Sequence, residues 1–297
     1  MKFAIYPGCT VQSEQYAYEI SARCIFPKLG IQLIDIEGFS CCGYPLKNVS
    51  ILAWFYLTAR NLALAENLSL DIIPLCNGCH LSFLEIKHYL EKYPELKKRI
   101  NSLLSMEGLK YTGNVKSVNI LQVLRETIGI NKIRAAVKIP IAGLKLATHY
   151  GCHALRPSNL GMPDDPEDPQ SLEEIIRALG AATEEYPERL DCCGQGLAMT
   201  SGKTALTISG IKLKAIQNHK FDGIVTICPS CTKMFDAKQN AIKMSTGQKD
   251  LDMPVMYITQ VLGLAMGMKV GEVGLNLNLS PVGEIFRKLE KVYHENE

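Results

Sequence analysis

Short apolar runs alternate with longer segments of helical periodicity along this chain. The apolar runs have the length expected of buried strands. They cover about residues 4–6, 71–75, 147–150 and 223–227. The helical segments cover about residues 11–29, 52–67, 172–179 and 204–219, and further helices begin near residues 81 and 232. Alternating strands and helices predict an α/β fold with parallel or mostly parallel sheets.

The same order of elements occurs twice. Residues 4–9 and 147–152 each form a short apolar strand that ends in Gly-Cys, and residues 71–76 and 223–228 each form an apolar run that ends in Cys. Ligands of parallel sheets gather beyond the carboxyl ends of the strands, so we expect these cysteines at the sheet rims. The pattern predicts two pseudo-symmetric domains, each with a small, mostly parallel sheet and flanking helices.

The expected domain boundaries follow from this repeat. Residues 1–92 and 144–254 are expected to form the two domains, joined by a helical linker at 93–143. Residues 255–297 are expected to form a C-terminal helical segment, whose apolar stretch at 258–268 would cover intramolecular core. That stretch is interrupted by Gln and Gly and is too short to span a bilayer, so we expect no direct membrane insertion.

Composition narrows the class of protein. Hydrophobic residues make up 47% and charged residues 21% of the 297 residues, which is typical of a globular chain. The formal net charge of +2 gives no general reason to expect nucleic-acid binding. The first residues lack the long apolar run and cleavage site of a signal peptide, so we expect a cytoplasmic protein with reduced thiols.

Ten of the eleven cysteines form two copies of one pattern, in which a single Cys is followed by Cys-Cys-Gly and then by Cys-x-x-Cys. Between the Cys pair and the Cys-x-x-Cys lie 33 residues in one copy and 34 in the other. The first copy comprises Cys9, Cys41, Cys42, Cys76 and Cys79; the second comprises Cys152, Cys192, Cys193, Cys228 and Cys231. Each half therefore offers five thiolates to one site. The remaining Cys24 lies in a predicted helix and is expected to pack in the core or on the helix face.

Disulfides, zinc and iron-sulfur clusters are the alternatives for these thiols. Disulfides are disfavoured in a reducing cytosol, and tetrahedral zinc, in one half or both, would leave one of five thiols unused. Adjacent residues such as Cys41 and Cys42 point in different directions, which favours binding to different irons. A cubane uses four thiolates, so a fifth indicates an expanded or opened cluster, or one bridging thiolate.

The repeated cysteine pattern resembles the CCG, or cysteine-rich, domain family, and a chain built from two such domains resembles the B subunits of heterodisulfide reductases. The resemblance implies a noncubane [4Fe-4S] cluster in each domain, held by the five cysteines of that half. It implies reversible two-electron reduction of the mixed disulfide of coenzyme M and coenzyme B. The disulfide would lie between the two clusters, and each sulfur would be captured by one iron.

The resemblance also implies partner subunits. This chain has no ferredoxin-type cysteine motif, so we expect it to receive electrons from a ferredoxin-type C subunit and a flavin-containing A subunit. Related subunits occur in sulfur-oxidising and membrane-linked complexes. One alternative is therefore an electron-transfer subunit with a different disulfide substrate or none, and another is a zinc-stabilised scaffold.

Two histidines stand close to the second cysteine pattern. His153 follows Cys152 directly, whereas Thr10 follows Cys9. His153 is expected to donate a proton to a leaving thiolate or to bind a substrate anion, because imidazole titrates near neutral pH. Helix capping, hydrogen bonding to a cluster sulfur and simple packing are the alternatives. His149 is expected to have a structural role in the strand.

The implied substrate carries a sulfonate and a phosphate, so its site needs cations or helix N-termini. Arg156, four residues after Cys152, and Lys203, at the start of a predicted helix, are the preferred candidates. Lys212 and Lys214 on the same helix are weaker candidates. Each of these side chains is alternatively an ordinary solvated cation.

Overall fold

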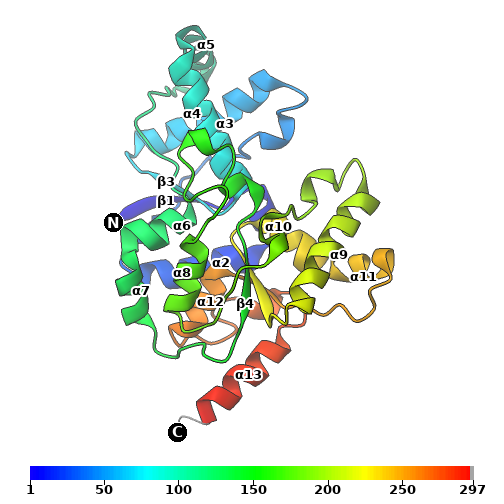
Figure 1. Ribbon diagram of the computed structural model, residues 1–297. Coiled ribbons are helices and arrows are strands. Elements are labelled where there is room, and N and C mark those ends of the chain that lie inside the picture. Colours follow the sequence, from blue (N-terminus) through cyan, green and yellow to red (C-terminus); the bar gives the residue numbers. More distant parts are fainter. Residues whose placement is uncertain (295–297) are drawn as a thin grey trace.

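Two three-stranded parallel sheets form the framework of residues 1–294, the part of the chain that this computed structural model describes (Figure 1). The strand orders are β2-β1-β3 and β4-β5-β6. The strands are β1 (Lys2–Tyr6), β2 (Gln32–Ile34), β3 (Ile72–Pro74), β4 (Leu146–His149), β5 (Gly223–Thr226) and β6 (Val255–Tyr257). All the strand pairs are parallel, as the alternation of apolar runs and helices predicts. The α/β fold with two pseudo-symmetric halves is confirmed.

Helices flank both sheets. Those of the first half are α1 (Gly8–Ser13), α2 (Tyr16–Lys28), α3 (Ile51–Asn67), α4 (Asn77–Lys92), α5 (Pro94–Leu104), α6 (Ile120–Gln122) and α7 (Ile130–Ala136). Those that follow are α8 (Ser171–Ala178), α9 (Gly202–Asn218), α10 (Pro229–Thr232), α11 (Gln239–Thr246), α12 (Ile258–Ala265) and α13 (Gly283–His294). Two π-helical turns, Val123–Gly129 and Lys233–Ala237, continue α6 and α10.

The helix expected over residues 11–29 is divided into α1 and α2. Gln15 lies between them with a non-helical backbone and a buried side chain. Its Oε1 accepts a hydrogen bond of 2.6 Å from the Tyr257 hydroxyl, which comes from the other end of the chain. A tertiary contact therefore overrides the local helical pattern at this position.

Strand pairing extends each repeat beyond its cysteines. In the first sheet, a parallel bridge joins Ile72 of β3 to Ser117. This bridge occupies the position that β6 has beside β5 in the second sheet. In the second sheet, a bridge joins Lys145, just before β4, to Ala182. This bridge occupies the position that β2 has beside β1 in the first sheet. Each sheet therefore has four strand positions in the same order, although one position in each sheet is a single bridge.

The helices after these last strand positions also correspond. Residues 120–124 read Ile-Leu-Gln-Val-Leu and residues 258–262 read Ile-Thr-Gln-Val-Leu. In each, the Gln side chain caps the helix, because Oε1 of Gln122 accepts from the Asn119 N–H and Oε1 of Gln260 accepts from the Tyr257 N–H. Residues 117–124, within the expected linker at 93–143, thus correspond to residues 255–262 of the second repeat.

The C-terminal segment expected over residues 255–297 is not wholly helical. It begins with β6 of the second sheet, and only then come α12 and α13, while its last three residues lie outside the described chain. We propose that the repeats reach past the expected boundaries at residues 92 and 254. The apolar stretch at 258–268 is intramolecular core, as predicted. None of the helices in residues 1–294 combines the length and apolar character needed to cross a bilayer.

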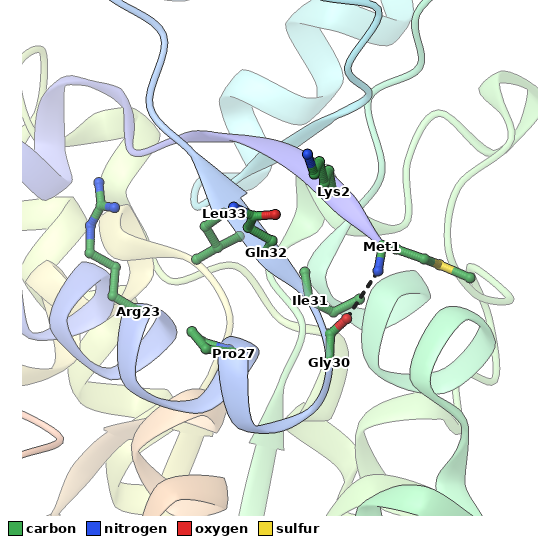
Figure 2. A pocket seen from close by; sticks show the side chains of 8 residues that line it. All are labelled: Met1, Lys2, Arg23, Pro27, Gly30, Ile31, Gln32 and Leu33. Carbon is green, nitrogen blue, oxygen red and sulfur yellow. Dashed lines mark hydrogen bonds between the residues drawn. The ribbon is translucent and has the colours of Figure 1, made fainter.

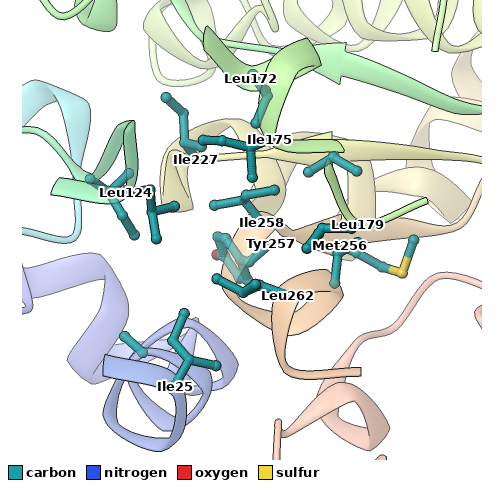
Figure 3. Packing of buried hydrophobic residues seen from close by; sticks show 14 of the residues in the cluster. Ile25, Leu124, Leu172, Ile175, Leu179, Ile227, Met256, Tyr257, Ile258 and Leu262 are labelled. Carbon is teal, nitrogen blue, oxygen red and sulfur yellow. The ribbon is translucent and has the colours of Figure 1, made fainter. Parts of the chain in front are cut away.

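The two repeats exchange their last helices across the core. Helix α12 of the second repeat packs on α2 of the first, and the α6–α7 segment of the first packs on α8 of the second. Figure 3 shows Ile25, Leu262, Leu124 and Ile175 from these elements in one buried cluster. Buried polar contacts cross the same interface, including a 2.6 Å hydrogen bond between the hydroxyls of Ser21 and Thr259. This reciprocal packing holds the cysteine-bearing rims of the sheets in a fixed relation.

We expect Leu262→Ala to lower the free energy of unfolding by about 2–5 kcal/mol, because it leaves a cavity between α12 and α2. Leu262 is fully buried, whereas Met244 on α11 is 88% exposed. Met244→Ala is therefore the matched control, with an expected change within about 0.5 kcal/mol. Chemical denaturation measures both values, and equal effects of the two substitutions would contradict the packing described above.

Candidate metal centre

The five patterned cysteines of each repeat converge beyond the carboxyl ends of the strands. We call them the first quintet (Cys9, Cys41, Cys42, Cys76, Cys79) and the second quintet (Cys152, Cys192, Cys193, Cys228, Cys231). Cys76 and Cys228 directly precede α4 and α10, while Cys79 and Cys231 lie in the first turns of those helices. The paired cysteines lie in the loops before α3 and α9. The expected position at the sheet rims agrees with this arrangement.

Side-chain contacts follow the same order in both quintets. In the first, the Sγ atoms of Cys9 and Cys41 are 4.0 Å apart. Cys42 contacts Cys41 and Cys79, and Cys79 contacts Cys76. In the second, the corresponding contacts join Cys152 to Cys192, Cys192 to Cys193, Cys193 to Cys231 and Cys231 to Cys228. All eleven cysteines are free thiols. The cystine alternative therefore has no support in the described chain.

The two quintets touch each other. The Cys76 side chain packs against the core cluster of the second repeat that contains Cys228, and the two thiols lie close enough for Cys228 to raise the pKa of Cys76. The Asn77 amide donates to the carbonyl oxygen of Tyr150, at 2.7 Å. The Cys-x-x-Cys turns of the two repeats thus meet at the interface, so groups bound by the two quintets would be neighbours.

Glycines allow the backbone to approach the sulfur atoms. Gly8 and Gly151 have φ of +75° and +76°, and a Cβ atom on either would lie 3.1 Å from Sγ of Cys79 or Cys231. The N–H groups of Gly43 and Gly194 donate to Sγ of Cys41 and Cys192 at 3.5 and 3.3 Å. Such backbone donors stabilise thiolates.

Helices α3 and α9 fix the loops that carry the paired cysteines. The Thr58 hydroxyl donates to the carbonyl oxygen of Cys42, and the Ser209 hydroxyl donates to that of Cys193. One turn further along each helix, the Asn61 amide donates to the carbonyl oxygens of Ser40 and Cys41, and the Lys212 ammonium donates to that of Asp191. The paired cysteines are therefore positioned by side chains from a rigid element.

His153 of the second repeat reaches across to the first. Its Nε2 is 3.2 Å from the hydroxyl oxygen of Tyr44, and its ring packs edge-on against the Tyr44 ring with centroids 5.1 Å apart. Its Nδ1 faces Gly78, between Cys76 and Cys79. Burial lowers the pKa of His153, which favours the neutral imidazole. His153 thus lies where the two quintets adjoin.

The predicted cations lie in different environments. Arg156 is exposed, lines a small cavity with Cys152 and donates to the carbonyl oxygen of Pro166 at 3.2 Å. Lys203 is exposed in the first turn of α9. Lys214 forms an ion pair of 2.7 Å with Asp250. Lys212 is only 1% exposed and faces backbone carbonyls, so the weaker prediction that it binds substrate is wrong.

His149, for which the sequence predicted only a structural role, is a further candidate for contact with the second quintet. It is buried at the end of β4, and one of its ring nitrogens lies within 4.8 Å of Sγ of both Cys193 and Cys231. Neither ring nitrogen has a hydrogen-bond partner among the described residues. The second quintet therefore has an unsatisfied polar group beside it. Cys24, by contrast, lies in α2, packs against the core and donates to the Glu272 carbonyl, as expected.

A cavity of about 490 Å³ lies far from this chemistry (Figure 2). Lys2 and Gln32 on its wall are the first residues of β1 and β2, whereas the cysteines follow the other ends of the strands. In Figure 2 the terminal amine of Met1 donates to the carbonyl oxygen of Gly30 at 3.0 Å. This cavity supplies no thiol and is not part of the candidate centre.

The crowded thiols fit a metal centre. Hydrogen bonds to Cys42 and Cys193 raise the pKa of Cys79 and of Cys231, respectively. Ionising a whole quintet therefore requires a compensating positive charge, which metal ions supply. Five convergent sulfur donors suit iron-sulfur chemistry better than tetrahedral zinc. Fold and site together define a class, a two-repeat α/β protein that presents two adjoining quintets of sulfur ligands.

Comparison with known proteins identifies the family. Residues 3–84 and 146–236 match the cysteine-rich domain family, CCG, and the chain belongs to it. The B subunit of the ferredoxin/F420H2-dependent CoB-CoM heterodisulfide reductase of Methanosarcina acetivorans is 32% identical over 98% of both chains. The 8-methylmenaquinol:fumarate reductase membrane anchor subunit of Wolinella succinogenes is 34% identical over 94% of this chain and 96% of its own.

A solved structure shows the same fold. A hypothetical protein from Helicobacter pylori superposes with a TM-score of 0.78 over 95% of this chain, at 18% sequence identity. This chain covers 52% of that protein. The likeness supports the arrangement of the two repeats and carries no statement about activity.

We expect Gly194→Ala to disrupt the second quintet. Gly194 has φ of +84°, and an added Cβ would lie 2.5 Å from the carbonyl oxygen of Ala205. Strain of this kind costs about 1–3 kcal/mol. The neighbouring Gly196 has no atom within 4 Å of an added Cβ, so Gly196→Ala is the matched control. Denaturation and metal content per chain measure the effect, and an undisturbed Gly194→Ala protein would contradict the assigned loop geometry.

Proposed function

We propose that this chain is the catalytic iron-sulfur subunit of a heterodisulfide reductase complex. It would reversibly reduce the mixed disulfide of coenzyme M and coenzyme B to two thiols. The observation that carries this proposal is the contact between the quintets at Cys76 and Cys228, with His153 beside it. Two adjoining centres match a substrate with two sulfur atoms. The name of the Methanosarcina relative supports the same reaction.

The proposed cofactors are two noncubane [4Fe-4S] clusters, one on each quintet. All ten patterned cysteines would be ligands: Cys9, Cys41, Cys42, Cys76, Cys79, Cys152, Cys192, Cys193, Cys228 and Cys231. When bound, such clusters supply electrons one at a time and iron sites with affinity for sulfur. The two cysteines of the first pair contact each other and also reach different neighbours, Cys42 reaching Cys79 and Cys41 reaching Cys9, so one pair can bind different irons.

The side chains near the clusters would bind and protonate the substrate. His153 can deliver a proton from Nδ1, which faces Gly78, to a leaving thiolate, while the Tyr44 hydroxyl orients the ring through Nε2. Arg156 lies beside Cys152 at an exposed position from which it can bind an anionic group of the substrate. Lys203 would act in the same way at the start of α9. Both cations would hold the disulfide in register with the clusters.

The electrons would come from other subunits in the cytoplasm. We propose a ferredoxin-type C subunit and a flavin-containing A subunit as partners, because this chain carries no ferredoxin-type cysteine motif. The exposed thiols Cys9, Cys152 and Cys192 place one edge of each quintet at the surface of the chain. A relay from a partner can reach the clusters there.

A second candidate function is electron transfer without disulfide chemistry. The Wolinella relative is named as a membrane anchor subunit of a fumarate reductase, and it matches this chain over nearly its full length. In that role the clusters would pass electrons between a membrane or flavin partner and another subunit. The same quintets would serve both functions, so the substrate side chains distinguish them.

Oxidation of the iron-loaded protein in the presence of one thiol at a time tests the proposal. We expect a paramagnetic signal that requires coenzyme M or coenzyme B, because the thiol sulfur of a product binds at a cluster. 2-Mercaptoethanol is the control thiol and should give no signal. A signal that is the same with every thiol, or without any, would favour the electron-transfer alternative.

We expect His153→Ala to slow disulfide reduction by about 10²-fold or more, the usual contribution of a general acid. Iron content should stay unchanged, because His153 is proposed to act on the substrate and not to bind a cluster. His88→Ala, which removes an exposed histidine from α4, is the control and should leave turnover unchanged. Loss of iron from the His153 variant would show instead that this side chain supports a cluster.

A further inference from the structure

The two repeats differ at one buried position beside the paired cysteines. Asn61 in α3 and Lys212 in α9 stand at the same distance along the chain from their Cys-Cys pairs. The Asn61 amide donates to the carbonyl oxygens of Ser40 and Cys41, both at 3.3 Å. The corresponding contacts of Lys212 come from an ammonium group. The same structural task is thus performed by a neutral side chain in one repeat and by a cation in the other.

The Lys212 side chain is held in its charged form. Its Nζ donates to the carbonyl oxygens of Glu188, Arg189 and Asp191 at 2.9, 2.9 and 3.1 Å. Three acceptors satisfy the three N–H bonds of an ammonium, whereas a neutral amine would turn a lone pair toward one carbonyl. Burial lowers the pKa of Lys212 to about 8, which still leaves the ammonium dominant at neutral pH.

This buried charge forms no ion pair with a carboxylate among the described side chains, although the Asp191 carboxylate acts on it from farther away. Among the side chains of residues 1–289, no acidic group lies within 4.0 Å of the Lys212 ammonium, and an unpaired buried charge is strongly unfavourable. The charges that act on it are those of Cys231, the Asp191 carboxylate, Cys193 and Cys192, so three of the four come from the second quintet. An anionic cluster on the second quintet would be its counter-charge. At the equivalent position of the first repeat stands Asn61, which carries no charge.

The two repeats also differ at the carboxyl ends of their first strands, β1 and β4. Tyr6 and His149 occupy equivalent positions before Gly8-Cys9 and Gly151-Cys152. The Tyr6 hydroxyl donates to the carbonyl oxygen of Ser40, so its proton is occupied. The buried ring nitrogens of His149 have no partner in the described chain, and one of them lies within 4.8 Å of Sγ of Cys193 and Cys231. A His149 N–H can therefore donate to a sulfur atom of the second centre.

We infer that Lys212 and His149 give the second centre a higher reduction potential than the first. A nearby positive charge and a hydrogen bond to sulfur both stabilise the reduced, more negative state of a cluster. The inference rests on the proposed clusters but not on the disulfide substrate. Electrons entering the chain would then settle first on the second quintet, and the first would be the stronger reductant. Lys212 and His149 are positioning residues, since neither contacts substrate.

Redox titration of the full-length, iron-loaded protein tests this, with each centre followed by its paramagnetic signal. Cys192→Ser, which alters a ligand of the second quintet alone, identifies the signal of the second centre. The unsubstituted protein should show a higher midpoint potential for that centre. Lys212→Gln keeps N–H donors and removes the charge, so we expect a fall of tenfold or more in its reduction equilibrium, about 59 mV for one electron.

The controls separate charge from structure. Lys214→Gln, on the same helix but paired with Asp250 near the surface, should shift neither midpoint, and Lys212→Arg should keep the second midpoint high. His149→Phe should lower the second midpoint alone, and it serves if Lys212→Gln fails to fold. A second centre with the lower midpoint in the unsubstituted protein, or equal shifts at both centres, would overturn the inference. Iron-loaded protein that fails to reduce the disulfide refutes the proposed function but leaves these midpoints measurable.

Discussion

The crowding of ten thiols at the touching rims of two parallel sheets is the constraint on which this structure depends. Their mutual contacts raise the pKa of thiols such as Cys79 and Cys231, and Cys76 packs beside Cys228 across the boundary between the repeats. The exchange of α12 and the α6–α7 segment between the repeats fixes this contact, because both sheets are anchored in one shared core. Packing far from the cysteines thus determines how near to each other the two centres lie.

Much of this arrangement could be predicted from the sequence. The apolar runs that end in Gly8-Cys9 and Gly151-Cys152 locate two strands and their chemistry, and the spacing of the cysteines defines both quintets. The last strand positions at Ser117 and Val255–Tyr257 were missed, because a single bridge or a three-residue strand has too short a pattern to read. The break between α1 and α2 was also missed, since it depends on the distant Tyr257. Contacts such as His153 with Tyr44 exist only after the repeats have packed.

The departures from symmetry are where function is expected. The loops that hold the paired cysteines use equivalent hydroxyls, Thr58 and Ser209, so the ligand geometry is duplicated. The side chains around that geometry are not duplicated, since Lys212 replaces Asn61 and His149 replaces Tyr6. A duplicated scaffold with unequal surroundings would give the two proposed metal centres similar ligands and different electrostatic environments. In the proposed reaction, which reduces one disulfide to two unlike thiols, such a difference would let the two centres act differently on the two sulfur atoms.

The central claim is that each repeat gathers five sulfur ligands around one iron-sulfur centre and that the two centres adjoin. Anomalous diffraction at the iron edge, together with iron and sulfide analysis of the same crystals, tests it most directly. The claim predicts about eight irons per chain in two groups. Each group should lie within bonding distance of all five Sγ atoms of its quintet, and the groups should approach each other at Cys76 and Cys228. Tetrahedral zinc with a spare thiol in either repeat, or iron groups on opposite sides of the chain, would contradict it.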